Sequence, residues 1–218
     1  MNLGELITEF RSRTGDDVPA KYRFSDELVT GFANQAESEA AIRAKLLYDT
    51  DNVTILANKS IYDLDDTVFE IDSAVITDSS GVKKELILID RPTLDKECPF
   101  WREATNSKPK YLIQDEGKYE VTPIPDADYM MALNHYRTPI NLMYAESSEP
   151  EIKKRHHDGL VDWMVRQSMQ VKDIDASDLS LAPDAEAKFI ARFGIRRDAN
   201  VMRKQARKGA HTVKAIRF

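Results

Sequence analysis

The sequence holds few residues whose type and spacing could do chemistry, and His156, His157 and Asp158 are the first to consider. Imidazole and carboxylate groups are common metal ligands. The segment is expected to be helical, and consecutive side chains on a helix point about 100° apart, so these neighbours cannot chelate one ion together. The positions four residues on hold Leu160 and Val161, which add no ligand. We therefore predict no metal site here.

An acidic segment is the second candidate, because Asp63, Asp65 and Asp66 resemble the opening of a calcium-binding loop. Such a loop needs Gly at its sixth position and Glu at its twelfth. This sequence has Val68 and Ala74 at those positions, so a calcium loop is excluded. The pattern favours a solvated acidic turn.

Cys98 is the third candidate and the single cysteine, so no disulfide can form within the chain, which indicates a reducing compartment. It precedes an apolar stretch, and no basic residue lies directly before it, so the sequence favours a packed cysteine over a nucleophile. The GxGxxG, Walker A, GxSxG and HExxH motifs are all missing from the sequence. We predict no catalytic, metal-binding or cofactor-binding residues, no cofactor, and no enzymatic activity.

Charge is distributed unevenly along the 218 residues, whose formal net charge is −6. Residues 196–218 hold eight basic side chains and one acid, so they carry +7 and leave −13 on residues 1–195. A basic tail on an acidic body is typical of an arm that binds an acidic partner, and a solvated, disordered terminus is the alternative. The predicted docking residues of this arm combine apolar and basic side chains: Val201, Met202, Arg203, Lys204, Arg207, Lys208, Ile216 and Phe218.

Hydrophobic spacing predicts two helices at the start of the chain. The first has an apolar face of Leu3, Leu6, Ile7 and Phe10. The second is predicted over residues 25–48 and is capped by Ser25. Its alanine-rich stripe would let another helix approach closely, and it comprises Leu28, Phe32, Ala36, Ala40, Ala44 and Leu47. We expect this helix to end near residues 49–52.

Helices are also predicted near the other end of the chain. Ser148 and Glu151 match a capping box, which predicts a helix over residues 149–172. A last helix is expected from Pro183 to Gly194, with Phe189 and Phe193 on its apolar face.

The middle of the chain has the shorter period of β-strands. Turn residues at 78–81 separate strands at 68–77 and 85–90, and a second hairpin is predicted over residues 111–122. Further strand pieces are expected at 53–56, 61–64 and 129–136. The sequence therefore predicts an α+β protein, with one domain over residues 1–195 and a basic arm over 196–218. In that domain, helices at about 1–50 and 149–194 form a bundle, and a mostly antiparallel β region at about 53–137 is inserted between them.

The order of these pieces resembles the head-to-tail adaptor (connector) proteins of tailed bacteriophages, which form a ring beneath the portal. Each motif is weak alone, and together they cover most of the chain. The segments that carry the resemblance are Leu3–Arg11, Arg23–Val29, Glu37–Arg43, Cys98–Arg102, Pro109–Leu112, Val121–Asp126, Tyr136–Pro139, His157–Trp163 and Phe189–Gly194.

The resemblance implies a structural protein of the virion neck, assembled in the cytoplasm of the host bacterium. Such adaptors form rings of twelve copies, embrace the portal protein with C-terminal arms, and receive the next neck or tail protein on the lower face. DNA would pass through the channel without sequence-specific binding, and an acidic body suits a channel wall because like charges repel. No individual contact residue is carried over from the family.

Two other functions stay open. A tail-completion or stopper protein of the same neck would have the same general features, because sequence does not fix a position in a stack. A basic-armed nucleic-acid-binding protein is the second alternative, although the acidic body would repel phosphates and the arm has no aromatic residue before Phe218. No apolar run of about 18 residues and no signal peptide are found, so we expect a soluble intracellular protein without membrane contact.

Overall fold

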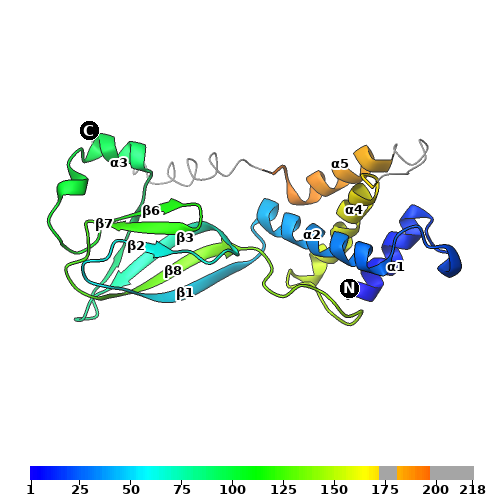
Figure 1. Cartoon of the computed structure of the whole chain (residues 1–218), viewed down its shortest axis with the longest axis horizontal. Coiled ribbons are helices and arrows are strands. Elements are labelled where there is room, and N and C mark those ends of the chain that lie inside the picture. Colours follow the sequence, from blue (N-terminus) through cyan, green and yellow to red (C-terminus); the bar gives the residue numbers. More distant parts are fainter. Residues whose placement is uncertain (172–180, 197–218) are drawn as a thin grey trace, which may run out of the picture. The chain divides into compact units, whose positions relative to one another are not determined.

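The computed structural model describes residues 1–171 and 181–196, which form two compact units (Figure 1). The helical unit comprises Met1–Leu47 and Arg137–Arg196, and the sheet unit comprises Tyr48–Tyr136. Helices and mainly antiparallel sheets confirm the predicted α+β class, with the β region inserted in sequence between helical segments. The basic arm beyond Arg196 lies outside the described residues, and a single adaptor domain over residues 1–195 stays a prediction.

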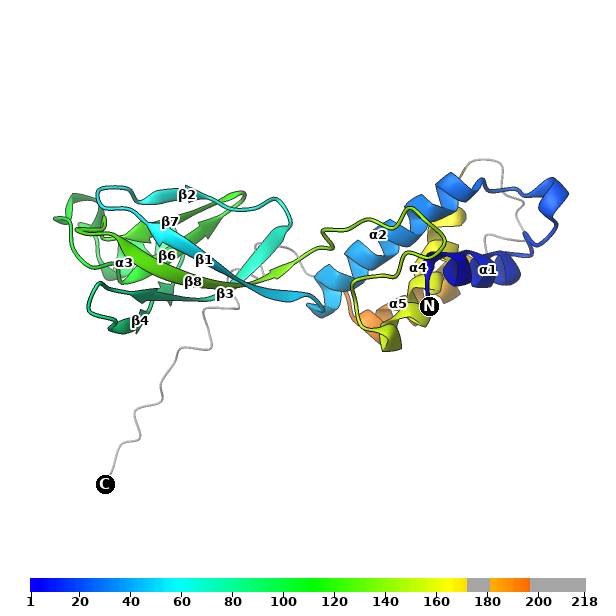
Figure 2. The same cartoon turned by 90° about the horizontal axis from the view of Figure 1, so that it is seen from below.

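The helical unit is built on four α-helices in the described residues: α1 (Leu3–Thr14), α2 (Asp26–Ala44), α4 (His157–Ser168) and α5 (Leu181–Phe193). Short 3-10 turns precede two of them, at Pro19–Lys21 and Lys154–His156. Figures 1 and 2 both show α4 beside α5, and α4 also contacts α1 and α2. The buried core joins both ends of the chain and includes Leu6, Phe10, Phe32, Ala36, Ala40, Leu160, Met164, Phe189 and Phe193.

The predicted start of α2 is confirmed, and its predicted end is wrong. The Ser25 hydroxyl accepts the backbone N–H of Leu28 at 3.3 Å, as an N-cap does. The helix stops at Ala44 because Lys45 takes a left-handed conformation with φ 51°. Leu28 is exposed, and Val29 is buried in its place.

The helix predicted over residues 149–172 begins later than expected. The chain is not yet α-helical at Glu151, and α4 begins at His157 after a 3-10 turn. The Glu151 carboxylate is engaged elsewhere, because it accepts the backbone N–H groups of Ile140 and Asn141 at 3.0 and 2.6 Å. The predicted capping box of Ser148 and Glu151 therefore does not form, and His156 lies at the N-cap of α4.

In the described residues the strands of the sheet unit form two four-stranded sheets. Sheet A has the order β1-β8-β3-β4 and sheet B has the order β2-β7-β6-β5; Figure 2 shows the strands of sheet A in this order. The strands are β1 (Tyr48–Ile55), β2 (Ile61–Asp63), β3 (Val68–Thr77), β4 (Lys83–Glu85), β5 (Ile87–Leu88), β6 (Tyr111–Asp115), β7 (Lys118–Thr122) and β8 (Tyr129–Arg137).

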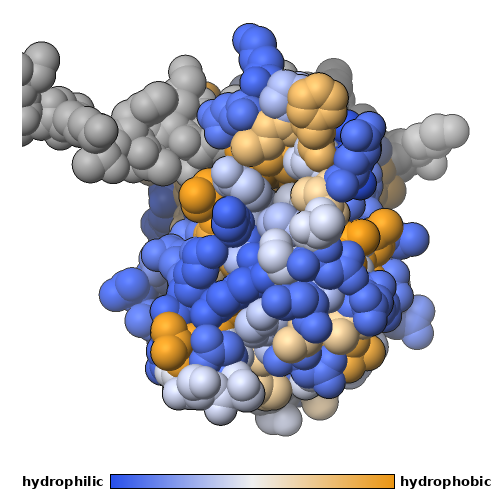
Figure 3. Space-filling model, turned by 90° about the vertical axis from the view of Figure 1, so that its left-hand side faces the viewer, coloured by the Kyte–Doolittle hydropathy of each residue, from blue (hydrophilic) through white to orange (hydrophobic). Residues whose placement is uncertain are grey.

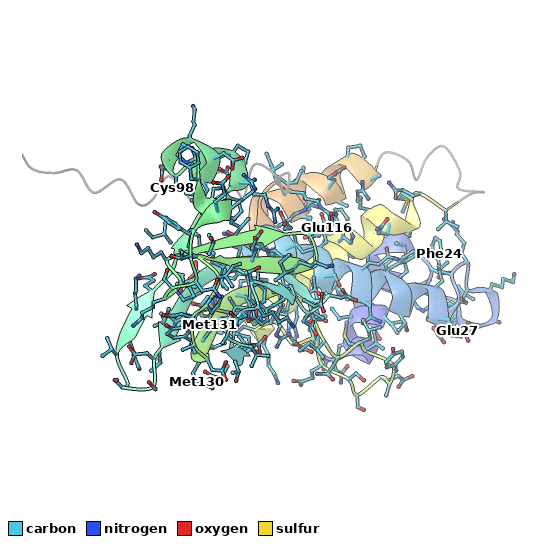
Figure 4. All side chains as sticks on the ribbon, turned by 60° about the vertical axis from the view of Figure 1, so that its left-hand side comes forward. Phe24, Glu27, Cys98, Glu116, Met130 and Met131 are labelled. Atoms are coloured by element: carbon cyan, nitrogen blue, oxygen red, sulfur yellow. The ribbon has the colours of Figure 1, made fainter. Side chains whose placement is uncertain are left out.

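The core of the sheet unit lies between the two sheets and includes Ile55, Ile71, Ile76, Leu112, Val121 and Met131. Neighbouring strand residues point to opposite faces, so Met131 is buried while Met130 is about half exposed on the same strand (Figure 4). A helix that the sequence reading missed, α3 (Arg91–Glu97), covers the other face of sheet B through Leu94 and Ile113. Its signal was present, because the Asp90 carboxylate caps the Thr93 N–H at 2.8 Å and Pro92 follows in the first turn.

Two strand predictions also need correction. The acidic residues 49–52 lie within β1, which pairs with β8 along its whole length from Tyr48 to Ile55. β1 is the last strand of its sheet and mostly exposed, so polar side chains cost little there. The expected return strand at 85–90 is two short strands, since β4 pairs antiparallel with β3 while β5 pairs parallel with β6.

Candidate interaction surfaces

The adjacent histidines have separate structural partners. His157 is buried, with Nε2 2.8 Å from the Ile152 carbonyl oxygen and Nδ1 2.7 Å from that of Met1. His156 is partly exposed, and its ring lies 6.0 Å from the ring of Phe193. Across the part of the chain that the structure describes, no cluster of three or more His, Cys, Asp or Glu side chains could hold a metal ion.

The acidic turn and the cysteine occupy the structural positions expected of them. Asp65 and Asp66 are exposed in a turn, where the Asp65 carboxylate accepts the N–H of Thr67 at 2.9 Å, while Asp63 ends β2. Cys98 ends α3 and packs half-buried against the cluster around Leu94, with its Sγ 3.8 Å from the hydroxyl of Tyr111. The packed position of Cys98 is thereby confirmed.

The point at which the chain leaves the helical unit is held firmly. α5 ends at Phe193, the following Gly194 adopts φ 85°, and the Arg43 guanidinium donates to the Gly194 carbonyl oxygen at 3.3 Å. One oxygen of Glu39 accepts from Arg43 at 2.7 Å and the other accepts from Arg196 at 2.9 Å. The side chain of Glu39 is only 9% exposed and that of Arg196 is 61% exposed, and their ion pair connects the root of the predicted arm to α2.

A hollow lies beside this root, and Trp163 in its wall is contacted by two guanidinium groups. The Arg43 guanidinium lies 4.8 Å from the ring centre of Trp163, and that of Arg166 lies 4.4 Å from the same ring. Such cation–π contacts hold the indole rigidly. The hollow is lined by Asn34, Gln35, Ser38, Glu39, Ile42, Leu142, Trp163, Gln167 and Arg196.

The segment between β8 and the helix α4 carries exposed apolar side chains that the sequence reading did not identify. Ile140, Leu142 and Tyr144 are 58%, 47% and 78% exposed, while Met143 between them is buried. Tyr144 also lines a second hollow, beside α1. The signal in the sequence was the cluster of four apolar side chains within five residues, from Ile140 to Tyr144. We name residues 138–148 the connecting loop.

Polar anchors hold the connecting loop in place. Glu151 accepts three hydrogen bonds from Ile140 and Asn141 and pairs with Arg137 at 2.7 Å. Burial opposes ionisation of Glu151, but these donors outweigh it and lower the pKa of the carboxyl. The Asn34 side chain donates to the carbonyl oxygen of Met143 at 3.0 Å and accepts its N–H at 2.8 Å. The exposed apolar residues are therefore presented by a fixed backbone.

Glu37 is a buried carboxylate on α2 next to these anchors. Its Oε1 accepts the backbone N–H of Ile152 at 3.1 Å, and its buried Oε2 has no hydrogen-bond partner among the described residues. Burial is the largest effect on it and raises its pKa to about 7. The group therefore changes its charge near neutral pH.

The remaining predicted site residues, in the arm from Val201 to Phe218, lie outside the described residues. On the face of the sheet unit seen in Figure 3, the surface is mostly hydrophilic and its apolar side chains are scattered. None of the described helices is both long and apolar enough to cross a membrane.

The chain thus has a helical unit with a sheet unit inserted in sequence and a connecting loop that carries exposed apolar side chains, and comparison with known families identifies it. The family model described as "SU10 adaptor protein" matches residues 1–214. The chain therefore belongs to this family of phage head-tail adaptors, which confirms the resemblance found in the sequence. It is a structural protein of the phage neck and hence of the virion.

Other comparisons add less. No match was found among curated protein sequences. A similar solved structure is described as "Neck of empty GTA particle computed with C6 symmetry", with 12% identity and a TM-score of 0.30. The similarity covers 84% of this chain and 90% of that chain.

Proposed function

We propose that this protein forms a ring that joins the portal to the tail and continues the DNA channel, and that its C-terminal arm docks on the portal. The ring would be a dodecamer, as in the family that the sequence resembles, and its other face would bind the next neck or tail protein. Assembly would take place in the host cytoplasm. The protein would act without catalysis or a cofactor, and DNA would pass without sequence-specific binding.

The observation that carries this proposal is the basic segment that follows a fixed root. Residues 196–218 carry +7 on a body of −13, and the first of them, Arg196, is paired with the nearly buried Glu39. A segment that begins at a fixed point and has no apolar stripe of its own is suited to gaining order on a partner. The body is negatively charged, as DNA is, and this repulsion would keep the channel wall from binding DNA.

The arm's apolar residues should contribute most of the docking free energy. Exposed ion pairs contribute about 0–1 kcal/mol each, whereas burial of Ile or Phe contributes roughly 1.5–3 kcal/mol. Ile216 and Phe218 would therefore anchor the arm, with Val201 and Met202 nearer its root. The basic side chains Arg203, Lys204, Arg207 and Lys208 would select an acidic portal surface and set the orientation.

The test is a portal-binding series at two salt concentrations. Deleting residues 197–218 keeps the Arg196–Glu39 pair, so it should abolish docking while circular dichroism and thermal unfolding show a folded body. Within the full chain, Ile216→Ala with Phe218→Ala should weaken binding more than Lys204→Ala with Lys208→Ala. Raised salt should weaken wild-type binding only in part.

The same series separates docking from nucleic-acid binding. A DNA-binding arm would lose affinity steeply with salt and would be indifferent to Ile216 and Phe218. Binding to duplex DNA is therefore measured beside binding to portal with the same variants. Docking that salt abolishes and that the apolar substitutions leave unchanged would contradict the proposal.

A further inference from the structure

The sheet unit has two opposite edges with opposite charge. β1 and β2 end their sheets on one side, and β4 and β5 end them on the other. Only Leu86 separates β4 from β5 in the chain, so these two strands share one edge of the two-sheet stack. Figure 2 shows β1 and β4 on opposite sides of sheet A. Both edges lie within one compact unit.

The edge formed by β1 and β2, here the acidic edge, gathers carboxylates. Asp51 on β1 lies 3.9 Å from the buried His135, and Asp65, exposed between β2 and β3, accepts the N–H of Thr67 at 2.9 Å. Asp63 and Asp66 are exposed beside them. The apolar side chains of Leu56 and Ile61 on this edge are 45% and 49% exposed.

The edge formed by β4 and β5, here the basic edge, gathers lysines from two segments. Lys83 and Lys84 lie on β4, and the backbone of Lys110 accepts the N–H of Ile87 on β5 at 2.9 Å. Burial, together with the nearby Lys110 and Lys108, lowers the pKa of Lys84, so these cations are neighbours.

Two acidic residues lie close to the basic edge, and its net charge stays positive. Asp78 pairs with Lys108 at 2.8 Å, and Glu85 is exposed on β4. The apolar Val82 and Ile87 are 56% and 53% exposed at this edge. The acidic edge likewise includes one cation, Lys59, whose Nζ lies 4.9 Å from the ring centre of Tyr62 on β2. Each edge therefore combines a net charge of one sign, negative or positive, with exposed aliphatic side chains.

From these edges we infer that a second copy of this chain is the partner of each edge, with the acidic edge of one copy against the basic edge of the next. A ring needs a heterologous contact, in which two different surfaces on opposite sides of a subunit meet. Charge complementarity sets the partner and the orientation, and the aliphatic side chains add buried area. This inference rests on the proposed ring.

Edge strands also explain why such a contact would be selective. An unpaired edge can pair with any other strand, and charged side chains at the edge restrict that. Lysines on β4 would repel another basic edge and carboxylates by β1 would repel another acidic edge, so two copies can meet in one sense only. The same edges can both be occupied at once because they lie on opposite sides of the stack.

The test uses charge reversal in the full chain. The acidic-edge variant carries Asp51→Lys and Asp66→Lys, and the basic-edge variant carries Lys83→Glu and Lys110→Glu. Among the described residues, Asp66, Lys83 and Lys110 form no ion pair, whereas Asp51 lies 3.9 Å from His135. The control variant, Lys96→Glu with Lys153→Glu, makes the same charge change as the basic-edge variant at exposed positions on α3 and before α4, outside the strands and turns that form the two edges.

Each edge variant alone should lose lateral association by at least about tenfold, because every contact then brings like charges together. An equimolar mixture of the two should recover rings on the portal, since reversed edges pair with reversed edges and native edges with native edges. The control should assemble as wild type. Electron microscopy and sedimentation velocity report ring formation, and circular dichroism reports folding.

Zero-length cross-linking tests the contact directly and separates it from the portal proposal. An equal mixture of ¹⁴N and ¹⁵N protein, treated with carbodiimide, should give mixed-isotope links from Lys83 or Lys110 to Asp51 or Asp66. These links in concentrated protein, without any binding to portal, would support the edge contact and contradict the proposed function. Portal-bound rings that lack these links would contradict the edge contact alone.

The remaining outcomes overturn the inference. Rings formed by either folded edge variant alone, or a mixture that fails to recover them, would show that the edges do not meet. Loss of duplex DNA binding in the basic-edge variant, with normal rings in the acidic-edge variant, would assign the lysines to nucleic acid instead.

Discussion

Different interactions hold the elements of each unit together: side-chain contacts in the helical unit and backbone hydrogen bonds in the sheet unit. In a helix the backbone hydrogen bonds stay within the element, so side chains alone join α1, α2, α4 and α5. In a sheet the backbone bonds run between elements, so β1 is tied to β8 along its whole length whatever its side chains are. One side chain should therefore matter more in the helical unit than an equivalent one in the sheet unit.

The largest expected effect is at Arg11, whose side chain is 6% exposed. Its guanidinium donates to Asp16 and Asp26 at 2.6 Å each, and it also holds the Phe24 carbonyl oxygen at 3.1 Å. Arg11→Ala leaves the buried carboxylate of Asp16 without its cation, so the free energy of unfolding should fall by about 3–5 kcal/mol. Urea denaturation measures this.

Arg91 is the matched residue in the sheet unit, because it also pairs with two carboxylates, those of Asp115 and Glu120. Its side chain is 37% exposed, so water replaces the lost contacts. Arg91→Ala should cost only about 0–1 kcal/mol. Equal losses for Arg11→Ala and Arg91→Ala would contradict the difference between the units.

The second expected effect depends on pH and concerns Glu37. Its pKa is raised to about 7 in the folded protein, so the buried charge destabilises the fold above pH 7 and no longer does so below about pH 4.5. Glu37→Gln removes that charge, and at pH 8 it should raise the free energy of unfolding by up to about 3 kcal/mol. At pH 4.5 the variant and wild type should have nearly equal stability. Denaturation at the two pH values measures the difference, and a pH-independent gain would show that Glu37 is not neutralised by burial.

The smallest expected effect tests how closely α4 and α5 approach. A Cβ at Gly159 would lie 2.7 and 2.9 Å from ring atoms of Phe193, so Gly159→Ala should cost about 1–3 kcal/mol. Gly31 on α2 is the control, since nothing lies within 4 Å of the corresponding position. Gly31→Ala should stabilise by about 0.5–1 kcal/mol. Thermal unfolding of both variants measures this, and a neutral Gly159→Ala would mean that the two helices are not tightly packed.

Sequence reasoning worked best where local signals and packing agreed. The Ser25 cap and the hydrophobic spacing located α2 and α5, and the turn at Asp115–Gly117 located the hairpin of β6 and β7. It failed at β1, because an edge strand tolerates acidic residues that a buried strand would not. It failed again at Glu151, which binds the connecting loop and does not cap a helix.

The interaction surfaces were harder to predict because they depend on contacts distant in sequence. The charge of the arm can be counted directly in the sequence. The position of its root cannot, because it depends on Arg43 and Arg196 both contacting Glu39. Likewise, the exposure of Ile140 and Tyr144 depends on Asn34, more than a hundred residues earlier, which holds Met143 inward. A single sequence gives no register for such pairs.

The most direct test of the proposed ring is to measure the mass of the protein and image it by electron microscopy, with and without its cognate portal. Alone, the purified chain should be a monomer or a weak oligomer, because the arm has no partner to offset its ordering entropy. With portal, mass photometry and electron microscopy should show a ring-shaped complex. A stable ring of twelve copies without portal would contradict the expected dependence on the arm, and the lack of any complex with portal would contradict the adaptor function itself.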